Sequence, residues 1–172
     1  MTRYWVMRTG PQNDTPLLSE ELLKKGLLRQ GWGYSPDQDL NRIASSGKEL
    51  SKDQRLSWRG NRRMLSTQRD GIQKGDLIVL PHLPERGRWS VVRVIGAYEY
   101  AIHDVRGDYG HILPVEPWTH RPVHPMEASA PLRQTMRTKC RLWNIDRLAV
   151  EVDKIVQVSK NGCSRRSIGY SQ

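Results

Sequence analysis

Two apolar segments that lie close together in the chain place the tightest constraint on its fold. Residues 75–81 and 88–100 both have the composition of strands, and the Pro- and Gly-containing stretch 84–87 between them is typical of a hairpin turn. Both faces of the second segment are apolar as far as Gly96, which is typical of a central strand covered on two sides. Because Gly96 permits a bend, the pair predicts strands that curl over a core into a small closed or half-closed barrel.

The remaining elements predict an α+β fold, a mixed β-barrel flanked by helices. Residues 16–28 carry leucines at helical spacing on one face and charged residues on the other. Further predicted strands are 3–9 and 111–116, and further predicted helices are a short one at 38–44, an interrupted one across 53–69, one beginning at Pro131 and one at 146–158.

The order of these elements predicts one main domain with a C-terminal addition. We expect residues 1–118 to form the barrel domain and the Pro- and His-rich stretch 119–131 to be a connector. Residues 132–158 are expected to form a helical extension, and the polar stretch 159–172 is expected to be a disordered tail.

Charge and composition narrow the class of partner. A formal net charge of +10 in 172 residues favours a polyanion, and nucleic acid is the commonest one. No apolar run of about 18 residues and no charged-then-apolar leader is present, so we expect no membrane partner and a cytoplasmic, intracellular protein. Cys140 and Cys163 lack CxxC spacing, so we expect reduced thiols rather than a disulfide framework or a zinc site.

Aromatic residues near the loop 31–34 form a candidate base-binding pocket. Trp32 lies between two glycines, where its ring is able to face a ligand, and stacking on such a ring is worth about 1 to 3 kcal/mol per base. The alternative for Trp32 is a core residue that closes the barrel end. The candidate pocket consists of Trp32, Gly33, Tyr34, Ser35, Tyr98, Asp108 and Tyr109.

Several of these pocket residues have competing interpretations. Tyr98 and Tyr100 alternate on one predicted strand, so one of the two is expected to be core. Asp108 is able to accept a hydrogen bond from an exocyclic amine, but an Asp before Tyr-Gly is more often a turn former.

Arginines supply candidate contacts to phosphates. Such contacts fix the register of a nucleic acid without reading its sequence, and the alternative is an ordinary solvated face. The candidates are Arg59, Arg62, Arg63, Arg69, Arg86 and Arg88.

Nothing in the sequence predicts a metal site, a cofactor or a catalytic centre. The histidines and aspartates of the region 103–124 lack the spacing of metal ligands, and no P-loop, GxSxG elbow or Cys/His pair is present. A nuclease would need acidic residues grouped with a Lys, yet Asp76, Glu151, Asp153 and Lys154 lack that arrangement. We therefore expect a chain that is not an enzyme, with a nuclease or modifying enzyme kept as an alternative.

The order of the motifs resembles the EVE and YTH branch of the PUA-like superfamily over residues 3–117. The motifs are a YWVM strand, a helix, the GWG loop, a KGDLIVL strand, a GRWSVVRVIG strand and a closing strand. The resemblance implies a PUA-like barrel whose aromatic pocket receives a modified or flipped base of RNA or DNA. By position it makes Trp32 the ring that opens the pocket, Tyr109 a second ring, and Trp89 a wall or core residue. This chain departs from the EVE pattern at residues 33–36, which read Gly-Tyr-Ser-Pro where EVE domains have Gly-Val-Arg-Asn.

A second likeness concerns residues 108–116. They look like part of the specificity domains that precede nuclease or ATPase modules in bacterial modification-dependent restriction systems, which implies a nuclease or ATPase partner. The leading hypothesis is thus a reader of a modified, flipped or single-stranded base. The alternatives are a protein-interaction or assembly subunit with a basic surface, or a nucleic-acid platform without base specificity.

Overall fold

A curled mixed sheet organises the structure, a computed structural model that describes residues 1–10 and 12–161. The strands are β1 (Tyr4–Met7), β2 (Leu27–Gln30), β3 (Leu77–Pro81), β4 (Trp89–Val94), β5 (Glu99–Tyr100), β6 (His111–Pro117) and β7 (Leu142–Asn144). Their order across the sheet is β2-β6-β4-β3-β1-β7, and β5 pairs with β6 outside this path. Strands β1 and β3 are parallel, and every other pairing is antiparallel.

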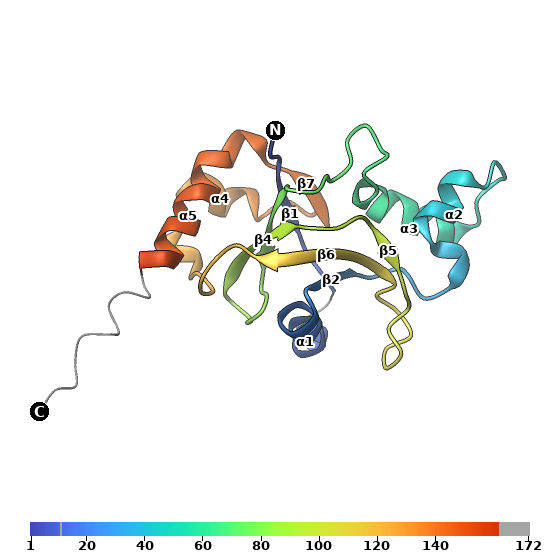
Figure 1. Ribbon diagram of the computed structural model, residues 1–172, viewed down its shortest axis with the longest axis horizontal. Helices are drawn as coiled ribbons and strands as arrows, with labels where there is room; N and C mark the ends of the chain where they lie inside the picture. The colour runs from blue at the N-terminus through green and yellow to red at the C-terminus, as the bar shows by residue number, and fades with distance from the viewer. Residues whose placement is uncertain (11, 162–172) are drawn as a thin grey trace, which may run out of the picture.

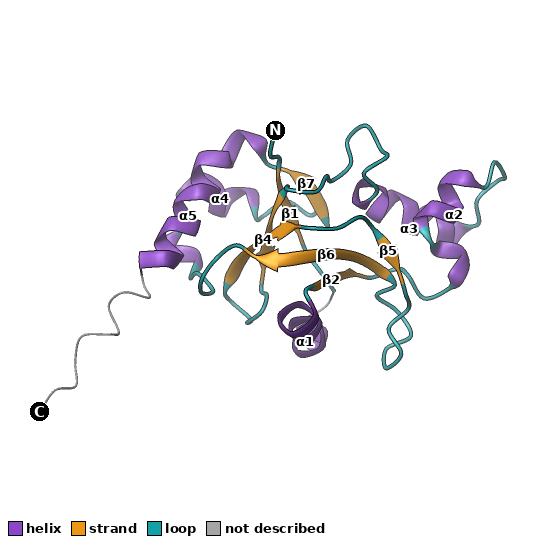
Figure 2. Cartoon of the chain, in the orientation of Figure 1, coloured by secondary structure: helices purple, strands orange, loops and turns teal. Residues whose placement is uncertain are grey.

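Helices cover the sheet from several sides. The α-helices are α1 (Thr15–Lys25), α2 (Leu40–Ser45), α3 (Lys52–Asn61), α4 (Ala130–Thr135) and α5 (Ala149–Asn161). The short 3-10 turns are η1 (Gln12–Asp14), η2 (Pro36–Gln38), η3 (Arg62–Met64), η4 (Pro125–Glu127) and η5 (Asp146–Leu148). Figure 1 shows α4 and α5 at one end of the molecule and α2 and α3 at the other, and Figure 2 shows the strands between them. None of the described helices is long and apolar enough to cross a membrane.

The central strands bury side chains on both faces of the sheet. Along β1, Trp5 and Met7 point into one core and Val6 points into another, because successive side chains of a strand alternate between faces. The same alternation along β3 and β4 supplies Ile78 and Val92 to the first core. This arrangement confirms the expected α+β half-barrel flanked by helices.

The C-terminal region covers the second core and completes the sheet. Val6 packs there with Leu132 of α4 and Ile155 of α5. Within the expected helical extension, β7 pairs antiparallel with β1, with Trp143 opposite Val6. Residues 142–144 of the expected helical extension at 132–158 thus form a strand, because pairing with β7 satisfies the backbone groups at the edge of β1, while α4 and α5 cover its apolar face. Of the expected tail, residues 159–161 end α5, and 162–172 lie outside the described residues.

Three predicted elements are shorter than expected or are divided. The helix predicted over 16–28 ends at Lys25, because Gly26 has φ 65° and its N–H donates to Glu21 O and Leu22 O. The following residues form β2, which pairs with β6. The strand predicted over 88–100 divides into β4 and β5 on either side of Gly96, and the helix predicted over 53–69 ends at Asn61 before the turn η3.

Substitutions in α5 test whether this helix belongs to the same cooperative unit as the sheet. Ile155 is 1% exposed, so Ile155→Ala is expected to lower the free energy of unfolding by about 2 to 5 kcal/mol. Val150 on the same helix is 66% exposed, so Val150→Ala is expected to change it by less than about 0.5 kcal/mol. Urea unfolding followed by both circular dichroism and Trp fluorescence measures the two. A separate transition for the helix, with an unshifted transition for the sheet, would contradict this packing.

Candidate functional site

The curled sheet brings the ends of its two outermost strands together. Gln30, the last residue of β2, donates from Nε2 to Arg8 O at 2.7 Å, just beyond the end of β1. The N–H of Arg8 donates to Arg141 O at 2.7 Å, just before β7 begins. The guanidinium carbon of Arg141 then lies 4.0 Å from the centre of the Trp32 ring. We call this closing contact, formed by residues 30–32, 8 and 141, the seam of the half-barrel.

Trp32 is held in a left-handed backbone conformation at the seam. Its φ is 67°, which is uncommon for a bulky residue and costs of order 1–3 kcal/mol. The loop around it is fixed from three directions: Asn61 Nδ2 donates to Gly31 O at 3.0 Å, Gly33 N donates to Asp108 at 2.9 Å, and His111 Nε2 lies 3.1 Å from Trp32 O. The surrounding structure therefore determines where the ring points.

The Trp32 ring lies outside both apolar cores and has two close neighbours. The ring is half-buried. It packs so closely on Gly60 of α3 that a Cβ there would lie 3.2 Å from ring atoms Cε3 and Cζ3. The Arg141 guanidinium lies over the ring, and burial lowers the pKa of this group. The ring thus already holds a planar cation.

Asp108 presents a free carboxylate oxygen beside this stack. Its Oδ1 accepts from Gly33 N at 2.9 Å and from Tyr109 N at 2.6 Å, while its Oδ2 accepts no hydrogen bond from the described residues. A Cβ on Gly31 would lie 3.5 Å from this Oδ2 and 3.7 Å from Nη1 of Arg141. Asp108 is therefore both the turn former of the alternative interpretation and a hydrogen-bond acceptor facing Gly31.

A buried polar network supports the Trp32 loop from below. His111 lies 2.9 Å from the Tyr98 hydroxyl through Nδ1 and 2.8 Å from the Ser57 hydroxyl through Nε2. Burial lowers the pKa of His111 to about 4, so the ring is neutral at pH 7. Ser57 and His111 are both 0% exposed, so this Ser–His pair has no access to a substrate and acts as a positioning contact.

Two buried amide groups next to the loop keep an unused polar atom. Gln38 Oε1 accepts from Tyr34 N at 2.9 Å and Ser35 N at 3.0 Å, but its Nε2 has no partner among the described residues. Asn61 donates to Gly31, but its Oδ1 likewise has no partner there. Since buried polar atoms are normally paired, Asn61 Oδ1, on a residue that is 0% exposed, is a candidate acceptor for a buried water.

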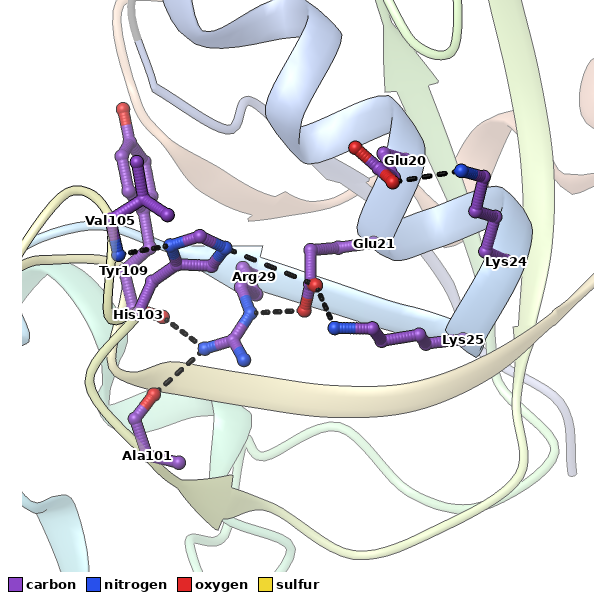
Figure 3. Close-up of polar contacts among 9 residues, drawn as sticks. All are labelled: Glu20, Glu21, Lys24, Lys25, Arg29, Ala101, His103, Val105 and Tyr109. Carbon is purple, nitrogen blue, oxygen red and sulfur yellow. Dashed lines mark hydrogen bonds and ion pairs between the residues drawn. The ribbon is translucent and has the colours of Figure 1, made fainter.

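A buried ion pair fixes the hairpin that carries Asp108. Arg29 of β2 donates from Nε to Glu21 of α1 at 2.8 Å, and from Nη1 to Ala101 O at 2.7 Å and Tyr109 O at 3.0 Å (Figure 3). Burial alone would raise the pKa of Glu21, but the bonds from Lys25 and Arg29 outweigh it and lower the pKa. Arg29 therefore ties both ends of the segment 101–109 to α1.

Only some of the predicted pocket residues come together in the structure. Trp32, Gly33 and Asp108 come together at the seam. Tyr98 is buried beneath them, and Tyr109 is buried with its hydroxyl donating to Asp14 at 2.5 Å. Tyr34 is exposed, and Ser35 is half-buried with its carbonyl accepting from the Tyr100 hydroxyl at 2.5 Å.

The predicted phosphate contacts do not form one track. Arg62 and Arg63 both pair with Asp70 at 2.8 Å, and these bonds lower the pKa of Asp70 to about 2. Arg86 and Arg88 lie on the β3–β4 hairpin beside α1, whereas the segment 59–69 lies at the other side of the sheet (Figure 1). Of the six candidates, those with an exposed side chain are Arg59, Arg69 and Arg86.

The residues considered for metal binding or hydrolysis are used otherwise. Among the described residues no group of three or more His, Cys, Asp or Glu side chains is placed to hold a metal ion. Asp76 is 1% exposed and accepts from Trp5 Nε1 at 2.9 Å, besides two backbone N–H groups. Glu151 pairs with Lys154 at 3.0 Å, and Asp153 accepts from the Tyr4 hydroxyl at 3.1 Å. Cys163 lies outside the described residues.

Sequence reasoning missed four residues of the site. Arg141 over Trp32, Asn61 bonded to Gly31 and Ser57 bonded to His111 join the site only through the folded chain, and no local pattern marks them. Gly60 does carry a signal, because a glycine inside a helix often marks the close approach of another group.

Comparisons with known proteins agree with this architecture. Residues 5–143 match the model of a family described as "Domain of unknown function (DUF8426)". The chain is similar to the YTH domain of the MRB1 protein of Zygosaccharomyces rouxii, solved in complex with N6-methyladenosine RNA, with 12% identity over 92% of this chain and 86% of that one and a TM-score of 0.51. This likeness shows that the chain has the YTH/PUA-like fold expected from its motifs.

Two further solved structures are similar at lower scores. Atu2648 from Agrobacterium tumefaciens has 12% identity over 92% of this chain and 93% of that one, with a TM-score of 0.44. Rpa0253 from Rhodopseudomonas palustris has 15% identity over 93% and 94%, with a TM-score of 0.40. No curated protein matches the chain.

The pH dependence of stability tests the buried His111. Its pKa of about 4 in the folded protein lies below the ordinary value of 6.5, because burial disfavours the charged imidazolium. Between these pH values the unfolded chain binds a proton that the folded chain does not. The stabilisation from a neutral His111 is therefore complete above about pH 6.5 and declines toward pH 4, by up to about 1.4 kcal/mol per pH unit.

Urea unfolding at pH values from 7 to 5 measures this decline. Because carboxylates also bind protons toward pH 5, variants are needed to assign the decline to His111. His111→Gln is expected to flatten the pH dependence relative to the unsubstituted chain, while His120→Gln, at an exposed position, is expected to leave it unchanged. Parallel pH profiles for all three proteins would show that His111 is not the group responsible.

Proposed function

Since the chain belongs to the DUF8426 family, whose description names no activity, we propose from the geometry of the seam that it binds nucleic acid by stacking one unpaired base on the ring of Trp32. The observation that carries the proposal is the Trp32 ring itself, which is half-buried, strained at φ 67° and stacked on a guanidinium at 4.0 Å. A strained backbone that the surrounding structure maintains is typical of binding sites. The formal net charge of +10 supports a polyanionic partner.

The base takes the face of Trp32 that Arg141 now covers. Gly60 leaves no room for a ligand on its own side of the ring, since even a methyl group there would lie 3.2 Å from ring atoms. A change of the Arg141 side-chain rotamer frees the first face, while the backbone bond from Arg8 N to Arg141 O at 2.7 Å keeps the seam closed. Arg141 then becomes available to a phosphate oxygen of the bound strand.

The free acceptor beside the stack favours a base with an exocyclic amino group. Asp108 Oδ2 is an acceptor without a partner among the described residues, and it faces Gly31. Adenine, cytosine and guanine donate from an amino group, whereas uracil and thymine do not. A methylated amine keeps one such donor, so a modified base remains compatible with this edge.

The solved YTH domain supports the same class of ligand. That protein was solved with N6-methyladenosine RNA, and it shares the fold of this chain at 12% identity. We therefore include RNA carrying a modified adenine among the ligands proposed for the Trp32 stack, with single-stranded DNA beside it. A role as a reader rather than an enzyme is part of the same proposal, and a nuclease or ATPase partner stays an expectation from the sequence.

Trp32→Ala tests the stacking interaction directly. Losing one stacked base is expected to weaken binding of single-stranded oligonucleotides by about 1 to 3 kcal/mol, which is roughly 5- to 150-fold in Kd. Trp118→Ala is the matched control, because Trp118 also lies under an arginine, with Arg93 at 4.3 Å, on a different part of the sheet. Fluorescence anisotropy with plain and methylated DNA and RNA strands measures the difference. Equal affinities for the two folded variants would refute the stacking role.

Asp108→Asn tests the edge of the base without disturbing the loop. The amide oxygen of Asn is able to keep the bonds from Gly33 N and Tyr109 N, while an NH2 donor replaces the free Oδ2 acceptor. Strands whose central base carries an amino group are expected to lose about tenfold in affinity relative to strands with uracil there. An unchanged preference would show that Asp108 acts only as a turn former.

A further inference from the structure

A second basic surface lies on the segment between α4 and η5. Residues 128–145 contain no Asp or Glu and carry four cationic side chains; a fifth, Arg147, comes after Asp146, which pairs with Arg3 at 3.6 Å. Arg137, Lys139 and Arg147 are exposed. Within the described part of the chain none of these five forms an ion pair. We call residues 133–147 the α4–η5 surface.

A cavity on this surface has the chemistry of an anion site. Its volume is about 560 Å³, and its lining residues are Pro131, Gln134, Thr135, Thr138, Arg147 and Leu148. A carboxamide, two hydroxyls and a guanidinium all donate hydrogen bonds to phosphate oxygens. The Thr135 hydroxyl oxygen accepts from Trp143 Nε1 at 3.3 Å, so its own hydrogen remains available for donation.

The segment between this cavity and the seam has a fixed course. The Arg8 guanidinium donates to Met136 O and, at 2.5 Å, to Thr138 O. The same group lies 5.3 Å from the centre of the Trp143 ring. These contacts hold residues 136–141 so that the chain leads from the cavity to Arg141 over Trp32, with Arg137 and Lys139 exposed along the way.

Competing basic groups are partly neutralised by acidic neighbours. Arg62 and Arg63 share Asp70, and Arg63 also donates to Leu142 O. Arg88 lies near enough to Glu127 to lower the pKa of that carboxyl, together with the larger contribution of its hydrogen bond from Arg121. By contrast, the cations of the α4–η5 surface form no ion pair with the described residues, and the segment that carries them continues to Arg141 over Trp32.

We propose that the α4–η5 surface binds the phosphodiester backbone of a single-stranded nucleic acid, with one phosphate in the cavity beside Arg147 and the neighbouring ones along Lys139 and Arg137. The direction of the strand, from the cavity to Trp32, rests on the function proposed above. The attraction for the backbone does not, because it depends on charge and donors alone.

The test compares two triple variants of equal charge. Arg137→Gln, Lys139→Gln and Arg147→Gln together neutralise the surface, and Arg42→Gln, Lys48→Gln and Lys74→Gln neutralise three exposed cations elsewhere, none of which is a candidate phosphate contact. Affinity for a labelled twelve-nucleotide single strand is measured at several salt concentrations. The first variant is expected to lose about tenfold or more in affinity at low salt, and the slope of log K against log salt is expected to fall by about 2, at about 0.7 per phosphate contact.

The outcomes separate this proposal from the stacking proposal. If both triple variants lose affinity and slope equally, net charge alone is responsible and the α4–η5 surface is overturned. If only the first variant does so while Trp32→Ala binds normally, the surface stands and the stacking proposal fails. If Trp32→Ala weakens binding and the first triple variant matches the control, the stacking stands and the surface is overturned. A strand with one abasic position, which keeps every phosphate, is expected to retain the dependence on the first three cations.

Discussion

Burial of both faces of β1, β3 and β4 is the constraint on which the other features of this protein depend. A strand with apolar side chains on both faces needs two separate layers to cover it, and the chain supplies them from different ends: α1 with β2 and β6 on one side, α4 and α5 on the other. The outer strands β2 and β7 are left to close the curled sheet. Since their ends carry polar and aromatic loops, the point of closure is also the point where side chains that are not part of a core come together.

Buried polar contacts give this point its rigidity. Arg29 joins α1 to the hairpin of Asp108, and His111 joins β6 to α3 and to the carbonyl of Trp32. Both groups are almost completely enclosed, where a lost partner costs more than at the surface. The loop 31–33 is therefore positioned by three elements that do not adjoin it in the sequence. A site assembled in this way pays its ordering entropy during folding rather than during binding.

The sequence was most informative where the pattern is local and periodic. Alternating side chains along 88–94 predict a strand, and Gly96 predicts its bend because glycine tolerates a bent backbone. The position of Trp32 between two glycines is likewise visible in the sequence itself. The four-residue strand β2 was missed because its Leu27 and Leu28 extend the leucine pattern of α1, and only the left-handed Gly26 separates the two. β7 was missed because its three residues form a strand only by pairing with β1, which no local pattern in the sequence indicates.

Contacts between residues that are distant in the sequence also limited how much of the site could be predicted. The stack of Arg141 on Trp32 joins residues more than a hundred positions apart in the chain, and the pairing of Asp70 with Arg62 and Arg63 depends on a turn that no residue pattern specifies. Arginine content alone therefore indicated a basic protein but did not show which cations remain unpaired. The latter is decided by which acidic side chains the fold brings beside them.

Because Arg141 lies over Trp32, a ligand that binds this face of the ring must displace the guanidinium. A bare indole would release loosely held water to any flat apolar molecule, whereas here an arriving ligand must exchange with a resident cation of similar shape. The net gain is the difference between two stacks, so a ligand that offers only a ring gains little. A nucleotide brings in addition a phosphate that can receive the displaced guanidinium, and the exchange then favours ring and anion together over either one alone. Under the proposed function, the resident side chain would thus set a threshold that a ring without an anion does not pass and that a nucleotide passes.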